Sequence, residues 1–343
     1  MRKPAFLAAA VAACTQGHAA ATAAGSFLRG RGAKADKCTP SLQELAVDDI
    51  SYAEMTTRIC QVNWVFMGQS GYHWKDVDQV GCWKLKALNT NALMSSGVYQ
   101  NENDGRCTLV FSGYHGKLRG AYSAITDTVK LWRNKQEMCG YTVYQPFVRL
   151  LQIHTASGNW SKIADALGGP SSTCTHVTVA AESMGGSVGE ILAACANQGL
   201  LSQSGLQNAS LPTFQIQKLY TFGSVAPATE PIRNPLRADG CFEGLRLYIH
   251  GDFYVGMGHH IGMSHSRVDA REIFHTRSGG VARRDYACNS TDAIGDKRHK
   301  PPPASEAISA QQRVNDMSNH EITTYMRDMR VILGLPATPV PSR

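Results

Sequence analysis

The stretch VTVAAESMGGSVGEILAACAN, residues 177–197, changes character in its middle. Its first half is apolar and β-branched, as expected for a strand buried on both faces of a parallel sheet, and its second half is rich in small helix formers. Ser183 lies at the joint, with Ala181, Gly185 and Gly186 around it. Small neighbours allow a sharp turn from strand to helix, and the helix N-terminus favours developing negative charge near the hydroxyl. The stretch predicts a nucleophilic serine; the alternative is a serine that only caps the helix.

Several other apolar runs also end in glycine. They are CTLVFSGYHG (residues 107–116), IQKLYTFGS (216–224) and LRLYIHGD (245–252). Strands separated by helix-sized segments predict an α/β protein with a mainly parallel central sheet flanked by helices. The last run places Asp252 after a strand, where open parallel sheets place their sites, although an ordinary turn residue is the alternative reading.

A serine nucleophile needs a histidine base that a carboxylate orients. Six histidines follow Asp252 in the sequence: His259, His260, His265, His275, His299 and His320. The cluster HHIGMSH (259–265) lacks a regular ligand spacing and an accompanying carboxylate set, so we expect no metal site. His320 begins a helix-forming C-terminal segment and is either the base or a helix-start residue without a special role.

Together these stretches resemble the class 3 lipases, the fungal triacylglycerol lipase-like branch of the α/β-hydrolases, over about residues 48–333. The resemblance implies a single-domain α/β-hydrolase fold and no cofactor. The family's base comes from the segment that DMSNHEITTYM (316–326) resembles, whereas the segment like GMSHSRVDAREIF (262–274) carries a noncatalytic histidine. The implied triad is therefore Ser183, Asp252 and His320, and the implied oxyanion hole uses the backbone N–H groups of Met184 and Tyr114.

The chain departs from the family at the site itself. Ala181-Glu182 replaces the usual Gly-His before the serine, and Tyr114 replaces a small hydroxyl residue. The expected substrate is a glycerolipid, which implies peripheral contact with lipid interfaces. The alternatives are small or feruloyl-type esters, or a catalytically silent fold that binds a lipid or a protein. The segment HGKLRGAYSAITDTVKLW (115–132) is either an amphipathic lid or an ordinary packing helix.

The N-terminus has the pattern of a secretory signal peptide. Arg2 and Lys3 precede a short apolar run and then small residues, which predicts a signal over residues 1–24. Residues 25–40 form a basic propeptide or linker, and 41–343 the hydrolase domain. We expect the protein to be secreted or to lie in the endomembrane lumen, with plastid or other second-step targeting as the alternative.

The ten cysteines are consistent with that route. Cys14 lies in the predicted signal, and the other nine allow up to four disulfides and at least one thiol, for which we choose Cys195 because it sits in an apolar helical pattern. Candidate glycosylation sites are Asn159, Asn208 and Asn289. The net charge is +7, but no aromatic-interleaved basic stripe predicts nucleic-acid binding.

Overall fold

The computed structural model describes residues 48–66, 77–113, 134–157, 159–203, 206, 213–250, 252, 255, 263–276, 280–290 and 322–335. The helices in these ranges are α1 (Asp48–Phe66), α3 (Gln145–Thr155), α4 (Trp160–Gly168), α5 (Ser183–Asn197), the short 3-10 helix η3 (Leu201–Gln203) and α8 (Ile322–Ile332). The strands are β1 (Gln79–Val80), β2 (Trp83–Thr90), β3 (Ser95–Asn101), β4 (Cys107–Phe111), β5 (Lys135–Met138), β6 (Tyr141–Tyr144), β7 (Val177–Glu182), β8 (Ile216–Phe222), β9 (Phe242–Ile249), β10 (Val268–His275) and β11 (Val281–Tyr286).

Nine strands form one sheet in the order β1-β2-β3-β4-β7-β8-β9-β10-β11. The five central strands, β4, β7, β8, β9 and β10, pair in parallel, and antiparallel strands extend the sheet at both edges. All residues of β4 and β7 are buried, as their continuous apolar sequences predict. Strands β5 and β6 form a separate hairpin.

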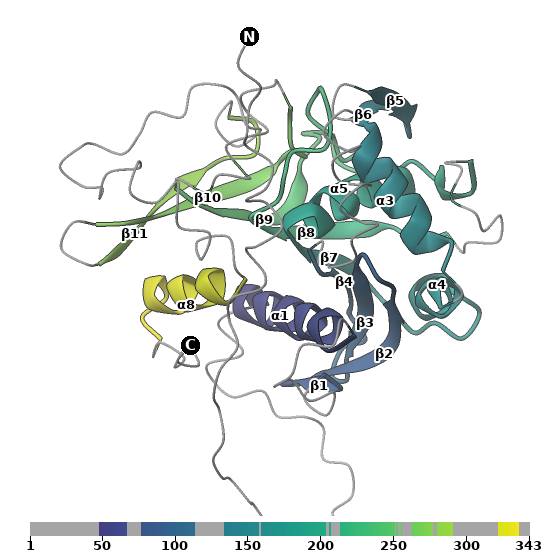
Figure 1. Cartoon of the computed structure of the whole chain (residues 1–343), viewed down its shortest axis with the longest axis horizontal. Coiled ribbons are helices and arrows are strands. Elements are labelled where there is room, and N and C mark those ends of the chain that lie inside the picture. The colour runs from purple at the N-terminus through teal and green to yellow at the C-terminus, as the bar shows by residue number, and fades with distance from the viewer. Residues whose placement is uncertain are drawn as a thin grey trace, which may run out of the picture.

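Helices cover both faces of the sheet (Figure 1). Along β4, Leu109 and Phe111 pack in the core under α3, α4 and α5, whereas Val110 packs in the core under α1 and α8. This alternation follows from the two-residue period of a strand. The α/β-hydrolase fold class predicted from the sequence, a mainly parallel sheet flanked by helices, is confirmed.

The cysteine pairing corrects one expectation. Cys195, predicted to be the thiol, forms a disulfide with Cys139, and Cys60 remains a buried thiol instead. Cys139 lies in the turn between β5 and β6 with a φ of 49°, followed by Gly140 with a φ of 75°. Two positive φ values define a tight hairpin turn, and the end of α5 packs against it. The prediction was wrong because helical periodicity shows that Cys195 is buried but not which distant segment covers it.

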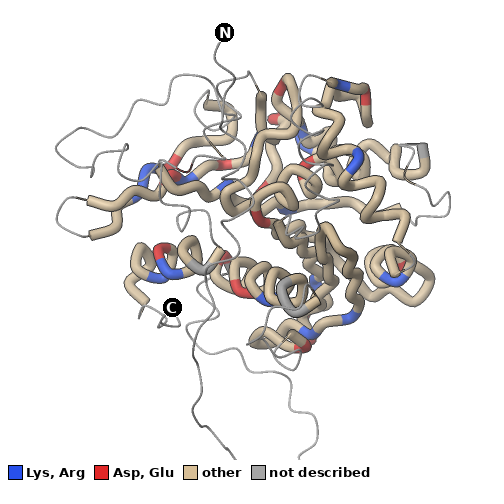
Figure 2. The backbone as a smooth tube through the Cα atoms, in the orientation of Figure 1, with Lys and Arg blue, Asp and Glu red and all other residues tan. Residues whose placement is uncertain are grey.

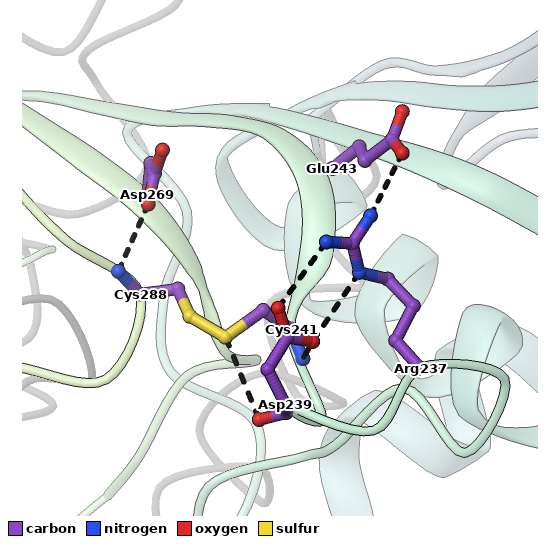
Figure 3. A network of polar contacts seen from close by, with 6 residues as sticks. All are labelled: Arg237, Asp239, Cys241, Glu243, Asp269 and Cys288. Atoms are coloured by element: carbon purple, nitrogen blue, oxygen red, sulfur yellow. Dashed lines mark hydrogen bonds and ion pairs between the residues drawn. A yellow bond between two sulfur atoms is a disulfide. The ribbon is translucent and has the colours of Figure 1, made fainter.

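Two further disulfides tie other parts of the sheet. Cys107, at the start of β4, is bonded to Cys174, and Cys241, before β9, is bonded to Cys288, after β11. Figure 3 shows the polar contacts around the second bond. Asp269 accepts the Cys288 N–H at 2.9 Å, and Arg237 bridges two carboxylates nearby. Cys82 is also disulfide-bonded.

Lysine and arginine residues are spread over many elements of the described chain, interspersed with acidic residues (Figure 2). Within the described ranges, no helix combines the length and the apolar character that crossing a membrane requires. The predicted signal peptide, the basic segment 25–40 and the candidate lid at 115–132 lie outside the described residues.

Candidate active site

Ser183 occupies a sharp turn between β7 and α5. Glu182 before it is extended, with φ −116° and ψ 143°, and α5 begins at Ser183 itself. Ser183 has a φ of 55°, and in the described chain only Cys139 is another non-glycine residue with positive φ. Such a conformation costs a non-glycine residue about 1–3 kcal/mol and is found mainly where function requires it. The junction predicted from the sequence is therefore present as a strained strand-to-helix turn.

The glycines after Ser183 make this turn sterically possible. A Cβ atom on Gly185 would overlap the carbonyl oxygen of Ser112, and one on Gly186 would lie 2.6 Å from the Cβ and Oγ atoms of Ser224. The first turn of α5 is thus in direct contact with the chain that leaves β4 and with the chain that leaves β8. Any side chain at these two positions would push the turn at Ser183 away from the sheet edge.

The end of β4 lies beside Ser183. An ideal Cβ on Gly113 would lie 3.0 Å from the Ser183 Cβ. Ser112 holds this segment, because its Oγ accepts the Ser95 N–H at 2.9 Å and donates to the Gly113 carbonyl oxygen at 3.0 Å. Met184, which follows the serine, is half-buried at the start of α5. Tyr114, predicted to provide the second oxyanion N–H, lies outside the described residues.

Asp252 follows β9, three residues after the strand ends. Its side chain is 5% exposed. Its Oδ2 accepts a hydrogen bond from the Tyr325 hydroxyl at 2.8 Å, and its Oδ1 accepts the Val255 N–H at 3.4 Å. Burial, and then the neighbouring Asp252 charge, raise the pKa of Tyr325 well above its usual value, so the phenol is a neutral donor to the carboxylate.

Ser183 and Asp252 therefore stand at the same edge of the sheet. Their strands are separated by β8 alone, and all three strands run in parallel. Carboxyl ends of parallel strands meet at one edge, which is where open α/β sheets place their ligands. A Cβ on Gly223, just after β8, would lie 2.8 Å from the Tyr325 hydroxyl. Tyr325 thus crosses the end of β8 to reach Asp252 and attaches α8 to the site.

Tyr325 was not singled out from the sequence. The segment DMSNHEITTYM contains it, but the residue predicted to have a role in that segment is His320. His320, the predicted base, lies outside the described residues, two positions before α8 begins at Ile322. No local pattern indicates a tyrosine that contacts Asp252, because the two residues are 73 positions apart.

Glu182 is buried directly before Ser183, with 3% of its surface exposed. Its Oε2 accepts the Gly113 N–H at 2.8 Å and the Cys60 thiol at 3.5 Å. The charge that departs from the lipase pattern is thus directed toward the chain after β4 and toward α1.

His265 lies in a second buried polar cluster. Its Nδ1 is 3.0 Å from Glu190 Oε1, which also accepts the Ser224 hydroxyl at 2.9 Å, and Glu190 Oε2 accepts the Ser266 N–H at 2.6 Å. Burial alone raises the pKa of Glu190, but His265 and these donors outweigh it, so the pKa lies below its usual value. The cluster joins α5 to the chain before β10 and gives His265 a structural partner.

A serine hydroxyl also contacts a histidine ring away from Ser183: Ser96 Oγ lies 2.8 Å from His154 Nε2. Asn89 and Asn91, not a carboxylate, contact the same imidazole. Burial lowers the pKa of His154 to about 3, so the ring is neutral and a very weak base. Because Ser96 and His154 are both fully buried, we interpret this pair as a core contact between β3 and α3.

No protein-family profile and no curated protein matches the chain. Among solved structures, the chain is similar to lipases of fungal origin. Lipase II from Rhizopus niveus is 15% identical with a TM-score of 0.48, covering 80% of this chain and 93% of that one. A Rhizomucor miehei lipase propeptide complex is 14% identical with a TM-score of 0.48, covering 82% and 81%.

The Lip2 lipase from Yarrowia lipolytica is 12% identical with a TM-score of 0.45, and the match covers 82% of this chain and 93% of that one. The resemblance to fungal triacylglycerol lipases is thus found in the solved structures as well as in the sequence segments. These three identities are 15% or lower and the three TM-scores are below 0.5, so the similarities carry no conclusion about the activity of this chain.

Proposed function

We propose that this chain is a serine carboxylester hydrolase that cleaves acyl esters of glycerolipids through a Ser183–His320–Asp252 triad. The observation that carries the proposal is the positive φ of Ser183 at a strand-to-helix turn, with the buried Asp252 at the same sheet edge. A helix-capping serine does not require this strained conformation, whereas a nucleophile held clear of the sheet does.

In the proposed mechanism, Ser183 Oγ attacks the ester carbonyl carbon while His320 accepts the hydroxyl proton. The backbone N–H groups of Met184 and Tyr114 hold the resulting oxyanion, and the position of Met184 at the start of α5 adds the favourable field of a helix N-terminus. The tetrahedral intermediate collapses to an acyl-serine, and the leaving alkoxide takes the proton from His320. His320 then deprotonates a water molecule, which attacks the acyl carbon and releases the acid and the serine.

Asp252 would orient His320 and stabilise the imidazolium that forms. Two contacts support this role: Tyr325 and Val255 each donate to one carboxylate oxygen of Asp252 and so fix its direction. The start of α8 is attached to Asp252 through Tyr325, five positions after His320 in the chain. This connectivity favours His320 over the buried His265, which already has Glu190 as its partner.

An activity-based fluorophosphonate probe followed by peptide mapping tests the nucleophile. We expect labelling of the peptide that contains Ser183 and none in Ser183→Ala. No labelling of a folded wild-type protein, or labelling that persists in Ser183→Ala, would reject the mechanism.

The substrate class is tested separately with esters of increasing acyl length and with emulsified triacylglycerol. A lipase hydrolyses long-chain esters at an interface, so we expect activity to persist at long chain lengths. A rate that collapses beyond short chains would instead favour an esterase acting on small or feruloyl-type esters.

The identity of the base is tested with His320→Ala and His265→Ala. We expect His320→Ala to lose activity while its thermal unfolding stays close to wild type. His265→Ala should be destabilised, because Glu190 loses its partner in the core, but should keep much more of its activity at low temperature. The opposite pattern would move the base to His265.

We also propose that the protein is secreted through cleavage of residues 1–24. The disulfides support this, because such bonds form and persist in oxidising compartments. N-terminal sequencing of protein recovered from the medium should begin close to residue 25, and recovery of the uncleaved chain inside cells only would contradict the proposal. Asn159 and Asn289 are exposed, so a glycosidase that removes N-linked glycans should lower the mass of the secreted form.

A further inference from the structure

The carboxylate of Glu182 occupies an unusual place for a buried charge. It lies on the last residue of β7, directly before the nucleophile, and is almost entirely removed from solvent. A buried carboxylate is destabilising unless hydrogen-bond donors compensate it. Two donors converge on a single oxygen, Oε2: the Gly113 N–H from the chain after β4 and the Cys60 thiol from α1.

The Gly113 contact is the stronger of the two. An N–H donor at 2.8 Å from a carboxylate is a charge-assisted bond, whereas a thiol is a weak donor. The approach is so close that a Cβ on Gly113 would overlap Oε2. Glycine at position 113 is therefore required for this contact, and the carboxylate and the glycine backbone form a matched pair.

This contact fixes one of the two polar groups of Gly113, and Ser112 fixes the other. The Ser112 hydroxyl donates to the Gly113 carbonyl oxygen at 3.0 Å. The two contacts together hold the Gly113 backbone beside Ser183, directly before the N–H that is proposed to stabilise the oxyanion.

We infer that Glu182 is a positioning residue of the active site: its carboxylate oxygen accepts the Gly113 N–H and so aims the neighbouring oxyanion donor at the ester bound to Ser183. This inference rests on the proposed function. The role requires an acceptor oxygen on residue 182 within hydrogen-bond distance of the Gly113 N–H. It does not require the negative charge, because a charge close to a forming oxyanion would by itself oppose the reaction.

Three substitutions separate acceptor from charge. Glu182→Gln keeps an acceptor oxygen at the same reach without the charge, Glu182→Asp keeps the charge but is one methylene shorter, and Glu182→Ala has neither. For Glu182→Ala and Glu182→Asp we expect kcat to fall at least about tenfold with KM changed less than about threefold, because the oxyanion contact forms only in the transition state. Glu182→Gln should recover kcat to within about threefold of wild type.

An independent readout follows the Gly113 amide in protein labelled with ¹⁵N-glycine. Hydrogen exchange of this amide should be at least about ten times faster in Glu182→Ala and Glu182→Asp than in wild type, and close to wild type in Glu182→Gln. Cys60→Ala is the matched control, because it removes another donor to Oε2 and leaves the Gly113 contact in place. Its kcat should stay within about twofold of wild type.

The inference is overturned if Glu182→Gln loses as much kcat as Glu182→Ala, if Glu182→Asp outperforms Glu182→Gln, or if Cys60→Ala matches the loss in Glu182→Ala. If Glu182→Ala does not fold, the comparison of Glu182→Gln with Glu182→Asp decides alone. A folded wild-type protein that is neither labelled by the fluorophosphonate nor active on esters would reject the proposed function itself. A labelled wild-type protein whose Glu182→Ala variant keeps full kcat and Gly113 protection would reject the inference alone.

Discussion

The hydroxyl of Tyr325 lies 2.8 Å from Oδ2 of Asp252 and also accepts the Ile249 N–H at 3.3 Å. One phenol thus connects α8 to both the end of β9 and the carboxylate that follows it. The oxygen is fully buried, so water cannot replace these bonds. Asp252 is held by a side chain that comes from the same C-terminal segment as the proposed base.

Removal of this hydroxyl should weaken both stability and catalysis. In Tyr325→Phe a buried carboxylate oxygen loses the hydrogen bond from the phenol, so we expect the free energy of unfolding to fall by about 1–3 kcal/mol. We expect kcat to fall about tenfold, since Asp252 is less firmly oriented. Urea denaturation and ester kinetics measure the two effects. Tyr286→Phe is the control, because it also removes a hydroxyl that donates to a buried carboxylate, Glu272, and should leave kcat unchanged.

The positive φ of Ser183 predicts a stability difference between two inactive variants. Alanine keeps a Cβ atom in the left-handed region, whereas glycine does not. We expect Ser183→Gly to unfold with a free energy about 1 kcal/mol higher than that of Ser183→Ala. Equal stabilities in chemical denaturation would contradict a strained turn at this residue.

The close approach of α5 to Ser112 predicts that position 185 tolerates no side chain. The added methyl in Gly185→Ala meets a backbone carbonyl that cannot rotate away, so we expect a loss of about 1–3 kcal/mol and of most activity. Gly199→Ala also introduces a Cβ, at a φ of 69° but in open space. Gly199→Ala should lower the free energy of unfolding by about 1 kcal/mol and leave kcat unchanged. Similar losses of kcat in both variants would argue against a specific contact at the strand-to-helix turn.

The buried, neutral His154 predicts a pH dependence of stability. Its pKa of about 3 in the folded protein lies below its value of about 6.5 in the unfolded chain. Between these values the unfolded state binds more protons, so stability falls as the pH decreases from about 6.5 toward 3. The contribution is up to about 1.4 kcal/mol per pH unit.

His154→Gln removes this titration. The variant should be less stable than wild type at pH 7, and the difference should shrink as the pH is lowered to 4. Urea unfolding at several pH values measures it. A constant difference over that range would mean that His154 does not have the lowered pKa.

The parts of the fold that could be predicted are those with a local signal. Short apolar runs predict strands at β4, β7, β8 and β9, and a run of small helix formers predicts α5. Strand β3, SSGVYQN, was not identified, because serine, glycine and glutamine carry no apolar pattern. Its serine side chains are buried nonetheless, because the Ser95 hydroxyl donates to Thr90 Oγ1 and the Ser96 hydroxyl pairs with the His154 ring.

The same distinction applies to the site. Ser183 and its small neighbours form a motif within one turn, so the strand-to-helix turn was predictable. The contacts of Glu182 with Gly113 and Cys60 span 69 and 122 positions, and that of Tyr325 with Asp252 spans 73. No periodicity or spacing encodes such pairs, which form only when the ends of the parallel strands meet at one edge and helices α1 and α8 pack beside them.

The buried thiol of Cys60 offers a way to measure how often helix α1 separates from the sheet. The other described cysteines are in disulfides, so within the described chain Cys60 is the target of a thiol reagent. The reagent can reach this thiol only when α1 separates from the sheet. The modification rate under native conditions would therefore give the free energy of opening of the layer directly beneath Glu182. A substrate analogue bound at Ser183 should slow that rate if ligand binding and the packing of α1 are thermodynamically linked.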